Sequence, residues 1–412
     1  MKKFLAMVLA LMMTLALAAC GGGNDSQNTP SDTTTPADTS TPSDDTAAPS
    51  DDTAAPAEGQ VTIKVGGIGP ITGDLAQYGT ATQWGAQIAV DEINAQGGIQ
   101  FDLKYEDDAH DAEKAVNAYN ALKSWGMQIS MSSVTSTPAE ATSTMNFEDR
   151  IFGLTPSASS VATTQGKDNV FQMCFIDPAQ GTMAAHSIAD NNLGSKIAVI
   201  WKNDDVYSVG IYETFMEEAA KVGLEVVSDT NFNNATSTDF SVQIADAQKN
   251  GADLVFLPMY YQPASQILAQ AVSAGFTPKW FGVDGMDGIL TMEGFDTAMA
   301  EGIMLQTPFN ASSDDPATKA FVEEYQSRFG EVPNQFAANA YDCVYAYKQA
   351  LENAGATPDM TAEELCGLMI EQFTTMTFDG ITGTGATWSA EGAVSKQPTV
   401  VVIQDGAYVG LN

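Results

Sequence analysis

The chain has 412 residues, and its 52 acidic against 17 basic residues give a formal net charge of −35 at pH 7. A charge of this sign argues against nucleic acid or an anionic membrane surface as a partner. The sequence contains only two histidines, and its four cysteines show no CxxC spacing, which argues against a zinc site and a Cys/His nucleophile pair. We therefore expect no metal, no cofactor and no enzymatic activity.

The first 60 residues have the pattern of an export signal followed by an unfolded tether. Residues 1–19 join two lysines to an apolar run, as a secretory signal peptide does, and are not a membrane span. The run ends in Leu-Ala-Ala-Cys-Gly, which matches the bacterial lipoprotein box and predicts a lipid on Cys20. The alternative is an ordinary signal peptide with an incidental Cys. Residues 21–60 lack aromatic and large aliphatic side chains, so we expect 20–60 to be a disordered acidic tether.

The remaining residues, 61–412, alternate between strand-like and helix-like segments and are too many for one small core. The predicted strands are 61–68, 101–106, 128–131, 151–154, 170–175, 196–201, 224–227, 253–257, 279–283 and 399–404. The predicted helices are 80–96, 138–149, 206–222, 239–249, 263–274, one over 337–351 and one opened by a capping box at 361–364. This alternation predicts an α/β fold with two doubly wound parallel sheets, and two lobes imply a cleft between them.

Small hydroxyl side chains follow two neighbouring strands of the first predicted sheet. Ser132, Ser133, Thr135, Ser136 and Thr137 follow strand 128–131, and Thr155, Ser157 and Ser159 follow strand 151–154. Ligands of open parallel sheets bind beyond the carboxyl ends of the strands, and the N–H groups that open helix 138–149 favour an anion. The sequence therefore predicts a seat for a carboxylate here. The alternative is that Ser and Thr are ordinary turn and N-cap residues.

At this point the chain resembles the leucine/isoleucine/valine-binding proteins of bacterial ABC importers, which have the type I periplasmic-binding-protein fold. The resemblance covers nearly all of 61–412. It rests on 69–73 (GPITG), 76–79 (AQYG), 91–99 (DEINAQGGI), 105–108 (YEDD), 137–139 (TPA), 177–181 (DPAQG), 260–261 (YY) and 282–285 (GVDG). It implies two lobes joined by a multi-strand hinge: a first lobe of 61–177 plus 307–386, and a second lobe of 178–306 plus 387–412.

The resemblance also implies where an amino acid binds. The family's contacts to the carboxylate fall on Thr135, with Ser136 as the alternative one residue on. Its further carbonyl and hydroxyl contacts fall on the run Ser157, Ala158 and Ser159. The second lobe contributes two aromatic residues, which match Tyr207 and Tyr260, and an acid for the ammonium group, which matches Asp284. Tyr78 falls where relatives carry an aromatic pocket wall.

Two departures from the family concern this region. Prototypical members carry Glu where this chain has Asp284, and they link two cysteines at positions that are here His110 and about Val134. That disulfide is therefore absent. Cys343 and Cys366 are candidates for a different bridge, with buried free thiols as the alternative.

The function that the resemblance implies is a monomeric, lipid-anchored extracytoplasmic lipoprotein. It would capture a free amino acid, with leucine, isoleucine or valine expected, by closing its lobes, and hand it to an ABC permease in the membrane. The rival interpretation is a sensor on the same fold that reports a small amide, urea or aromatic acid.

Overall fold

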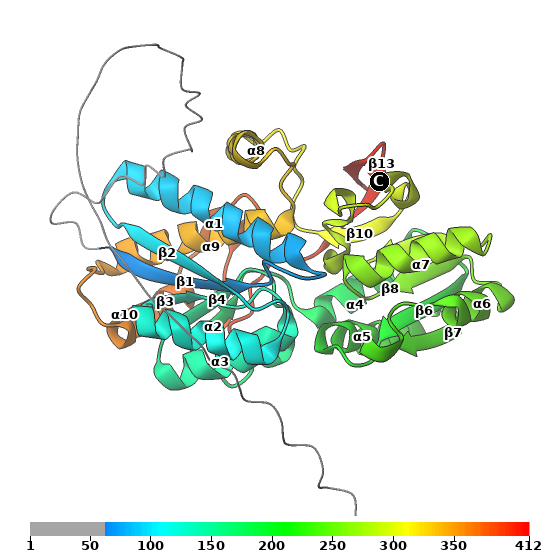
Figure 1. The fold of residues 1–412 in the computed structure, drawn as a ribbon, viewed down its shortest axis with the longest axis horizontal. Helices are drawn as coiled ribbons and strands as arrows, with labels where there is room; N and C mark the ends of the chain where they lie inside the picture. The colour runs from blue at the N-terminus through cyan, green and yellow to red at the C-terminus, as the bar shows by residue number, and fades with distance from the viewer. Residues whose placement is uncertain (1–61, 412) are drawn as a thin grey trace, which may run out of the picture. The chain divides into compact units, whose positions relative to one another are not determined.

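Two sheets organise residues 62–411, the part of the chain that this computed structural model describes (Figure 1). All of these residues belong to one unit of the chain. The predicted signal peptide, the lipid-bearing Cys20 and the tether lie outside the described residues. None of the helices within 62–411 has the length and apolar character needed to cross a membrane.

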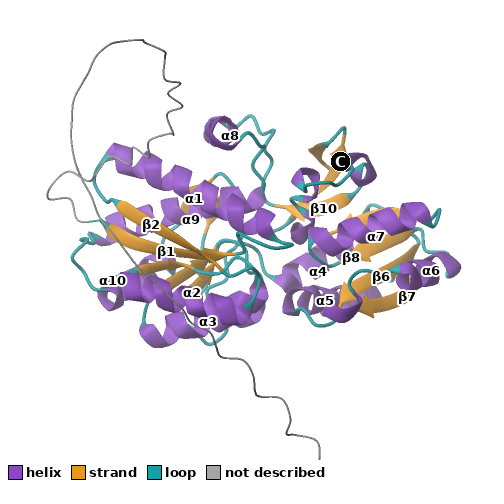
Figure 2. Ribbon diagram, viewed as in Figure 1, coloured by secondary structure: helices purple, strands orange, loops and turns teal. Residues whose placement is uncertain are grey.

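The first sheet is entirely parallel and has the order β2-β1-β3-β4-β5. Its strands are β1 (Ile63–Gly69), β2 (Phe101–Asp107), β3 (Ile129–Met131), β4 (Phe152–Thr155) and β5 (Val170–Gln172). A parallel sheet needs cover on both faces, and helices lie on both sides of it (Figure 2). They are α1 (Ala76–Gln96), α2 (Ala112–Trp125), α3 (Ser136–Asp149), α9 (Gln335–Ala354) and α10 (Ala362–Phe373). We call this sheet with its helices the first lobe.

The second sheet has the order β14-β13-β10-β9-β8-β6-β7. Its strands are β6 (Lys196–Lys202), β7 (Glu225–Phe232), β8 (Leu254–Leu257), β9 (Lys279–Gly282), β10 (Met304–Thr307), β13 (Thr399–Gln404) and β14 (Ala407–Gly410). The helices α4 (Asp177–Asp190), α5 (Val206–Val222), α6 (Ser241–Lys249) and α7 (Tyr261–Ser273) complete the second lobe. The α/β class with two wound sheets is confirmed, but β13 and β14 run antiparallel and form one edge of the second sheet.

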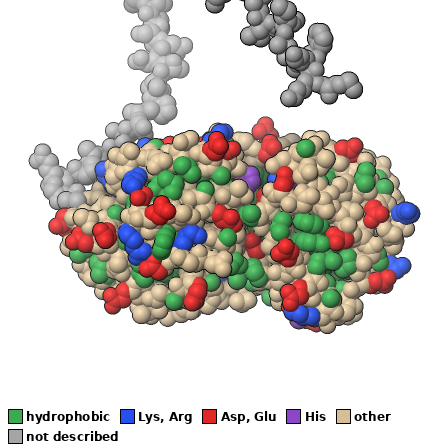
Figure 3. All heavy atoms as spheres, turned by 90° about the horizontal axis from the view of Figure 1, so that it is seen from below, with side chains coloured by type: hydrophobic (Ala, Val, Ile, Leu, Met, Phe, Trp, Pro, Cys, Tyr) green, Lys and Arg blue, Asp and Glu red, His purple; other side chains and the backbone are tan. Residues whose placement is uncertain are grey.

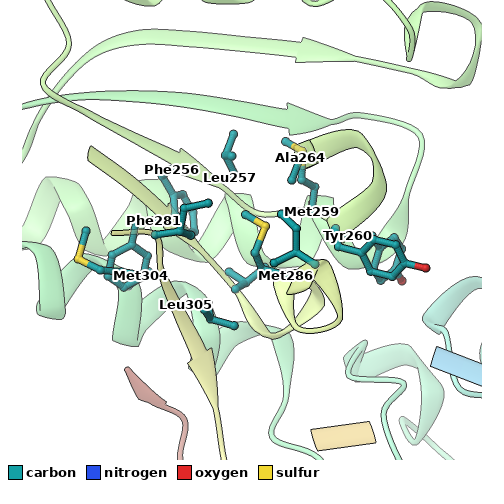
Figure 4. Packing of buried hydrophobic residues seen from close by; sticks show 14 of the residues in the cluster. Phe256, Leu257, Met259, Tyr260, Ala264, Phe281, Met286, Met304 and Leu305 are labelled. Carbon is teal, nitrogen blue, oxygen red and sulfur yellow. The ribbon is translucent and has the colours of Figure 1, made fainter. Parts of the chain in front are cut away.

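The core of the second lobe lies between its sheet and its helices (Figure 4). Phe256 of β8, Phe281 of β9 and Leu305 of β10 are fully buried there. Tyr260 lies at the rim of this cluster with its hydroxyl group pointing away from it. Burial of the strands on both faces explains why they read as nearly continuous apolar runs in the sequence.

Element boundaries differ from the prediction at several ends. Helix α1 begins at Ala76, four residues before the predicted start, and α3 begins at Ser136, so Pro138 lies in its first turn. Proline is tolerated there because the first-turn N–H groups have no intrahelical partner. Strand β7 runs on to Phe232 because it stays paired with β6 along the whole of that strand. The sequence did not reveal α2, α4, β10 or the helix α8 (Pro316–Phe329).

The chain passes between the lobes after β5, after β10 and before β13. The segment before β13 includes the hairpin of β11 (Phe378–Gly380) and β12 (Gly383–Ala386). Beyond this hairpin, Trp388 and Val394 pack into the core of the first lobe, and the indole N–H of Trp388 donates to the carbonyl of Gln172 over 2.8 Å. We therefore propose that the last passage between lobes follows Val394, later than the predicted boundary at 387.

The three cysteines of the described chain are buried free thiols, so Cys343 and Cys366 are not bridged. Burial raises the pKa of both thiols, so they stay protonated and unreactive at neutral pH.

Candidate functional site

A small cavity lies between the two lobes and brings together most of the predicted ligand-binding residues. Its lining consists of Tyr78, Val134, Thr135, Ser136, Ser157, Tyr207, Tyr260, Asp284, Gly285 and Phe336. Seven of the nine residues expected to bind ligand are in this set, and Ala158 and Ser159 are not. The cavity volume is about 10 Å³, which is room for about one water molecule.

Hydroxyl groups and the start of a helix form the first-lobe wall of this cavity. Thr135 and Ser136 lie at the start of α3, where backbone N–H groups point outward with the positive end of the helix dipole. Ser157 follows β4, and its N–H donates to the side chain of Thr155 over 3.3 Å. Thr155 in turn donates to the carbonyl of Ser133 over 2.9 Å, so the two hydroxyl-rich loops are tied together.

Ala158 and Ser159 are buried and do not line the cavity. The Ala158 N–H donates to the Thr155 hydroxyl over 2.9 Å, and its carbonyl accepts from the Gln172 amide over 2.8 Å. Ser159 is 1% exposed, and its carbonyl accepts from the N–H of Asp177 at the start of α4. These bonds fix the loop that carries Ser157. That Ala158 and Ser159 contact a ligand stays a prediction.

Two tyrosines and a buried acid form the second-lobe wall. The rings of Tyr207 and Tyr260 stack with centroids 4.6 Å apart. The Tyr207 hydroxyl donates to the Asp284 carboxylate over 2.5 Å and accepts from the N–H of Gly285 over 2.9 Å. The aromatic wall and the acid are therefore one hydrogen-bonded unit.

Asp284 is 3% exposed, and no Lys, Arg or His among residues 62–411 forms an ion pair with it. Burial raises the pKa of its carboxyl to about 6, against the stabilising hydrogen bonds from Tyr207 and Gln180. A carboxylate in this setting gains most from a partner that brings a positive charge and an N–H donor. The second-lobe wall is therefore suited to an ammonium group.

Tyr78 on α1 connects the lobes at the cavity. Its hydroxyl donates to the carbonyl of Gly285 and accepts from the N–H of Tyr261 over 3.3 Å. Its ring meets Phe336 edge-on, with centroids 4.5 Å apart. Sequence analysis did not identify Phe336, Gly285 or Val134 as lining residues. Phe336 has no motif of its own, because the apolar spacing of α9 is that of a core helix.

Further hydrogen bonds join the lobes directly around the cavity. The Gln77 amide donates to the carbonyl of Thr291 over 3.2 Å, the Tyr261 hydroxyl donates to the carbonyl of Asp74 over 3.0 Å, and the N–H of Gln335 donates to Asp287 over 3.0 Å. These contacts define a closed arrangement. Because the cavity is so small, any ligand larger than water requires the lobes or the tyrosines to move apart.

The described residues contain no cluster of metal ligands, and the face of the molecule in Figure 3 has no continuous basic surface. No group of three or more His, Cys, Asp or Glu side chains within 62–411 is arranged to hold a metal ion. On the face shown in Figure 3, basic side chains lie singly or in small groups among acidic ones. The cavity has hydrogen-bond donors on its first-lobe wall and an acid on its second-lobe wall.

Comparison with known proteins agrees with this geometry. Residues 62–407 match the family described as periplasmic binding protein. The chain is 28% identical over 309 residues to the leucine-, isoleucine-, valine-, threonine- and alanine-binding protein of Pseudomonas aeruginosa, covering 74% of this chain and 82% of that protein. It is likewise 28% identical to the Leu/Ile/Val/Thr-binding protein of Salmonella typhimurium, covering 75% of this chain and 84% of the relative.

Two solved structures share the whole fold. A leucine-binding protein from Thermotoga maritima superposes with a TM-score of 0.76 at 26% identity, over 85% of this chain and 98% of that one. The substrate-binding protein of a branched-chain amino acid transporter from Streptococcus pneumoniae, solved with isoleucine, has the same TM-score and identity, over 85% and 100%. A fold neighbour from R. palustris, 20% identical, was solved with benzoate.

Members of the matched family are solute-binding proteins rather than enzymes, and the family implies an extracytoplasmic location. The match spans nearly all of the described residues, and the curated relatives and solved structures agree with it. The chain belongs to the periplasmic binding protein family, among the type I proteins related to the leucine/isoleucine/valine-binding proteins of bacterial ABC importers.

Proposed function

We propose that the protein is the lipid-anchored substrate-binding component of an ABC importer and captures free leucine, isoleucine or valine. The observation that carries this proposal is the composition of the interlobe cavity. Hydroxyl groups and a helix start face Asp284, which is buried without an ion-pair partner among the described residues. Only a ligand with a carboxylate at one end and an ammonium group at the other satisfies both walls.

The ligand docks on the first lobe before the lobes close. Thr135, Ser136 and Ser157 hold its carboxylate together with the N–H groups of α3. Closure then brings Asp284 to the ammonium group, and Tyr78, Tyr207 and Phe336 surround the side chain. Closure is favoured because Asp284 contacts the ligand only in the shut form, and a ligand shifts an equilibrium by its differential affinity for the two states.

The relatives support this assignment of ligand and partner. The curated relatives from Pseudomonas and Salmonella bind leucine, isoleucine and valine by their names, and the pneumococcal structure contains isoleucine. A substrate-binding protein of an ABC transporter hands its ligand to permease subunits, which we propose as the membrane partners of this chain.

A ligand screen tests the proposal. The chain from Val61 is titrated in a thermal-shift assay with the twenty amino acids, benzoate, small amides and urea, and hits are measured by calorimetry. We expect the largest shifts from leucine, isoleucine or valine. A protein that responds to benzoate or an amide but to no amino acid would refute the proposal and favour the sensor interpretation.

Lipid anchoring is a separate part of the proposal and rests on Leu17-Ala18-Ala19-Cys20 in the sequence. Mass spectrometry of the membrane fraction should find a diacylglyceryl group on an N-terminal Cys20. A mature chain that begins at any other residue would contradict this part and leave the ligand assignment intact.

A further inference from the structure

His110 has an unusual backbone conformation. It lies beside the first-lobe wall of the cavity, which we call the carboxylate wall because the ligand carboxylate is proposed to bind there. It sits in the turn between β2 and α2 with a φ of 58°, next to Ala109 with a φ of 45°. Left-handed backbone is uncommon for residues other than glycine and persists where the surroundings hold it. Here Asp107 accepts from the N–H of Ala109, and Asp108 accepts from the N–H of His110, each over 2.9 Å. The turn is therefore built to present this imidazole in one direction.

The two ring nitrogens of His110 face different lobes. Nδ1 lies 2.8 Å from the hydroxyl oxygen of Thr135, the residue assigned to the ligand carboxylate. Nε2 lies 3.7 Å from a carboxylate oxygen of Asp205, which caps helix α5 of the second lobe. The imidazole thus connects the carboxylate wall to a buried acid across the cleft. Of the two histidines in the chain, His110 contacts this wall through Thr135, whereas His186 lies beside Glu218 of α5.

A buried acid of the second lobe, Asp205, faces His110. Asp205 is 2% exposed, and that oxygen has no hydrogen-bond partner. Burial acts to raise the pKa of Asp205, but His110 and Lys202 outweigh burial and hold it below its ordinary value, so Asp205 is ionised at neutral pH. The other charged or titratable side chains facing the imidazole are Asp74, Asp108, Lys202, Tyr207 and Tyr260.

Of these neighbours, Lys202 is the one cation, and it is itself 3.7 Å from Asp205. Burial raises the pKa of Asp108 to about 6, so this acid is ionised at neutral pH as well. The His110 side chain is 23% exposed and borders a second cavity of about 130 Å³, through which it can exchange protons with solvent.

We propose that His110 is a positioning residue whose protonated form turns the hydroxyl group of Thr135 toward the carboxylate of the ligand. This inference rests on the proposed function. In the doubly protonated ring, Nε2–H faces Asp205, and Nδ1–H donates to the Thr135 oxygen. The Thr135 proton is then free to be donated to the ligand. In the neutral ring with a proton on Nε2, Thr135 must donate to Nδ1 instead and offers a carboxylate only lone pairs.

When the ligand binds, the carboxylate wall therefore carries the positive charge of the protonated His110 ring. The hydroxyl residues alone would leave this wall neutral. Binding of a carboxylate favours the protonated ring, so the protein takes up protons as it binds. Imidazole side chains ordinarily exchange their proton between pH 5 and 8. The affinity for an amino acid should then fall as the pH rises from 6.5 to 8, a range in which the amino acid remains a zwitterion.

Calorimetry with leucine as the probe tests this dependence. The variants are His110→Asn, Asp205→Asn and, as the matched control, His186→Gln, which removes the other histidine of the chain far from the cavity. Asn suits a left-handed backbone and places an amide near Nδ1, so His110→Asn keeps a partner for Thr135 but removes the charge. Asp205→Asn keeps the cap of α5, because Asn is also a good N-cap residue.

We expect wild type and His186→Gln to lose about tenfold in affinity between pH 6.5 and 8, the scale of one charge-assisted hydrogen bond. Both should take up protons on binding at pH 7. The uptake is measured from the binding enthalpy in buffers of different ionisation enthalpy. His110→Asn should bind about tenfold more weakly than wild type at pH 6.5, with a flat profile and no uptake. Adding Asp205→Asn to His110→Asn should then weaken binding little further.

Three outcomes overturn the inference. If wild type binds leucine with the same affinity across this range, or if His110→Asn keeps the slope and the proton uptake, His110 does not control Thr135 and the ligand assignment stands. If wild type does not bind leucine at all, the proposed ligand assignment fails and this inference fails with it.

Discussion

Asp284 shows how burial sets the properties of a single residue in this protein. Its carboxyl has a pKa of about 6 because burial opposes the charge more strongly than Tyr207 and Gln180 stabilise it. The same group is the only acid lining the cavity. In the proposed function, the ammonium group of the ligand supplies the positive charge that no described side chain brings to this acid.

Replacement of this acid should weaken binding more than replacement of any donor on the opposite wall. Asp284→Asn keeps the shape of the side chain but leaves the ammonium group of the ligand unpaired, which typically costs on the order of 2–5 kcal/mol. We expect at least about a 30-fold loss of affinity for leucine by calorimetry. Thr135→Ala should cost less, because the N–H groups of α3 share the carboxylate. An Asp284→Asn protein that binds within about threefold of wild type would make Asp284 a structural acid.

The same substitution should stabilise the protein without ligand. The pKa of Asp284 is raised from 3.8 in the unfolded chain to about 6 in the folded one. The folded state therefore binds this proton more tightly, and stability is lost as the pH rises from about 4 to 6. At pH 7 the full penalty, about 2–3 kcal/mol, applies to wild type and is absent from Asp284→Asn.

Thermal unfolding of the two proteins checks this prediction. The variant should unfold several degrees above wild type at pH 7, and the difference should shrink toward pH 4. Saturating leucine should reverse the order at pH 7. Equal unfolding temperatures of wild type and Asp284→Asn at both pH values without ligand would show that burial of the charged Asp284 does not destabilise the protein.

At the scale of elements, helices α1 and α9 each place one aromatic side chain in the lining of the cavity. Tyr78 belongs to α1 and Phe336 to α9, so their separation depends on how closely the two helices pack. Gly85 of α1 lies against the backbone of Ala337 on α9, and a Cβ at Gly85 would overlap the carbonyl oxygen of Ala337. The absence of a side chain at Gly85 allows this approach.

Gly85→Ala should therefore push the two helices apart. We expect a loss of about 1–3 kcal/mol in stability, as for overpacked cores, together with weaker leucine binding. Gly367→Ala on α10 is the matched control, because nothing lies within 4 Å of a Cβ at that position. It should leave binding unchanged and raise stability by up to about 1 kcal/mol, the helix propensity gain. Urea unfolding and calorimetry distinguish the pair, and equal behaviour of the two variants would contradict the packing argument.

At the scale of the whole molecule, the body of residues 62–411 is distinct from the segment that carries the proposed lipid anchor. The family match begins at residue 62, and residues 21–60 lack the aromatic and large aliphatic side chains with which to join a core. Both lobes and all ten residues lining the cavity lie within 62–411. We therefore propose that capture of the ligand and attachment to the membrane belong to different parts of the chain.

A chain that begins at Val61 should fold, remain monomeric and bind leucine as tightly as one that begins at Cys20. Size-exclusion chromatography with light scattering, thermal unfolding and calorimetry compare the two without lipid. The expectation follows because the tether contributes no apolar surface to a core. Loss of folding, or weaker binding by more than about threefold, would mean that residues 20–60 contribute to the body.

The sequence by itself was enough to predict the α/β class and the meeting of two hydroxyl-rich loops at one site. These predictions rest on local patterns, namely periodicity, helix caps and the hydroxyl clusters after 128–131 and 151–154. Local patterns can be recognised without knowledge of the fold. The resemblance added the second-lobe residues in register, so Tyr207, Tyr260 and Asp284 were named before any geometry was known. The structure brings all three to one cavity.

Only the tertiary structure could decide contacts between residues that are distant in the chain. Phe336 reaches the cavity because α9 packs against α1, and the antiparallel edge of the second sheet depends on β13 returning to β10. Ala158 is buried, and its backbone carbonyl accepts from the side-chain amide of Gln172 on the next strand. The connection from Thr135 through His110 to Asp205 joins three elements in two lobes. No periodicity encodes such a contact, because it arises from side-chain direction and burial that exist only once the lobes have folded and closed.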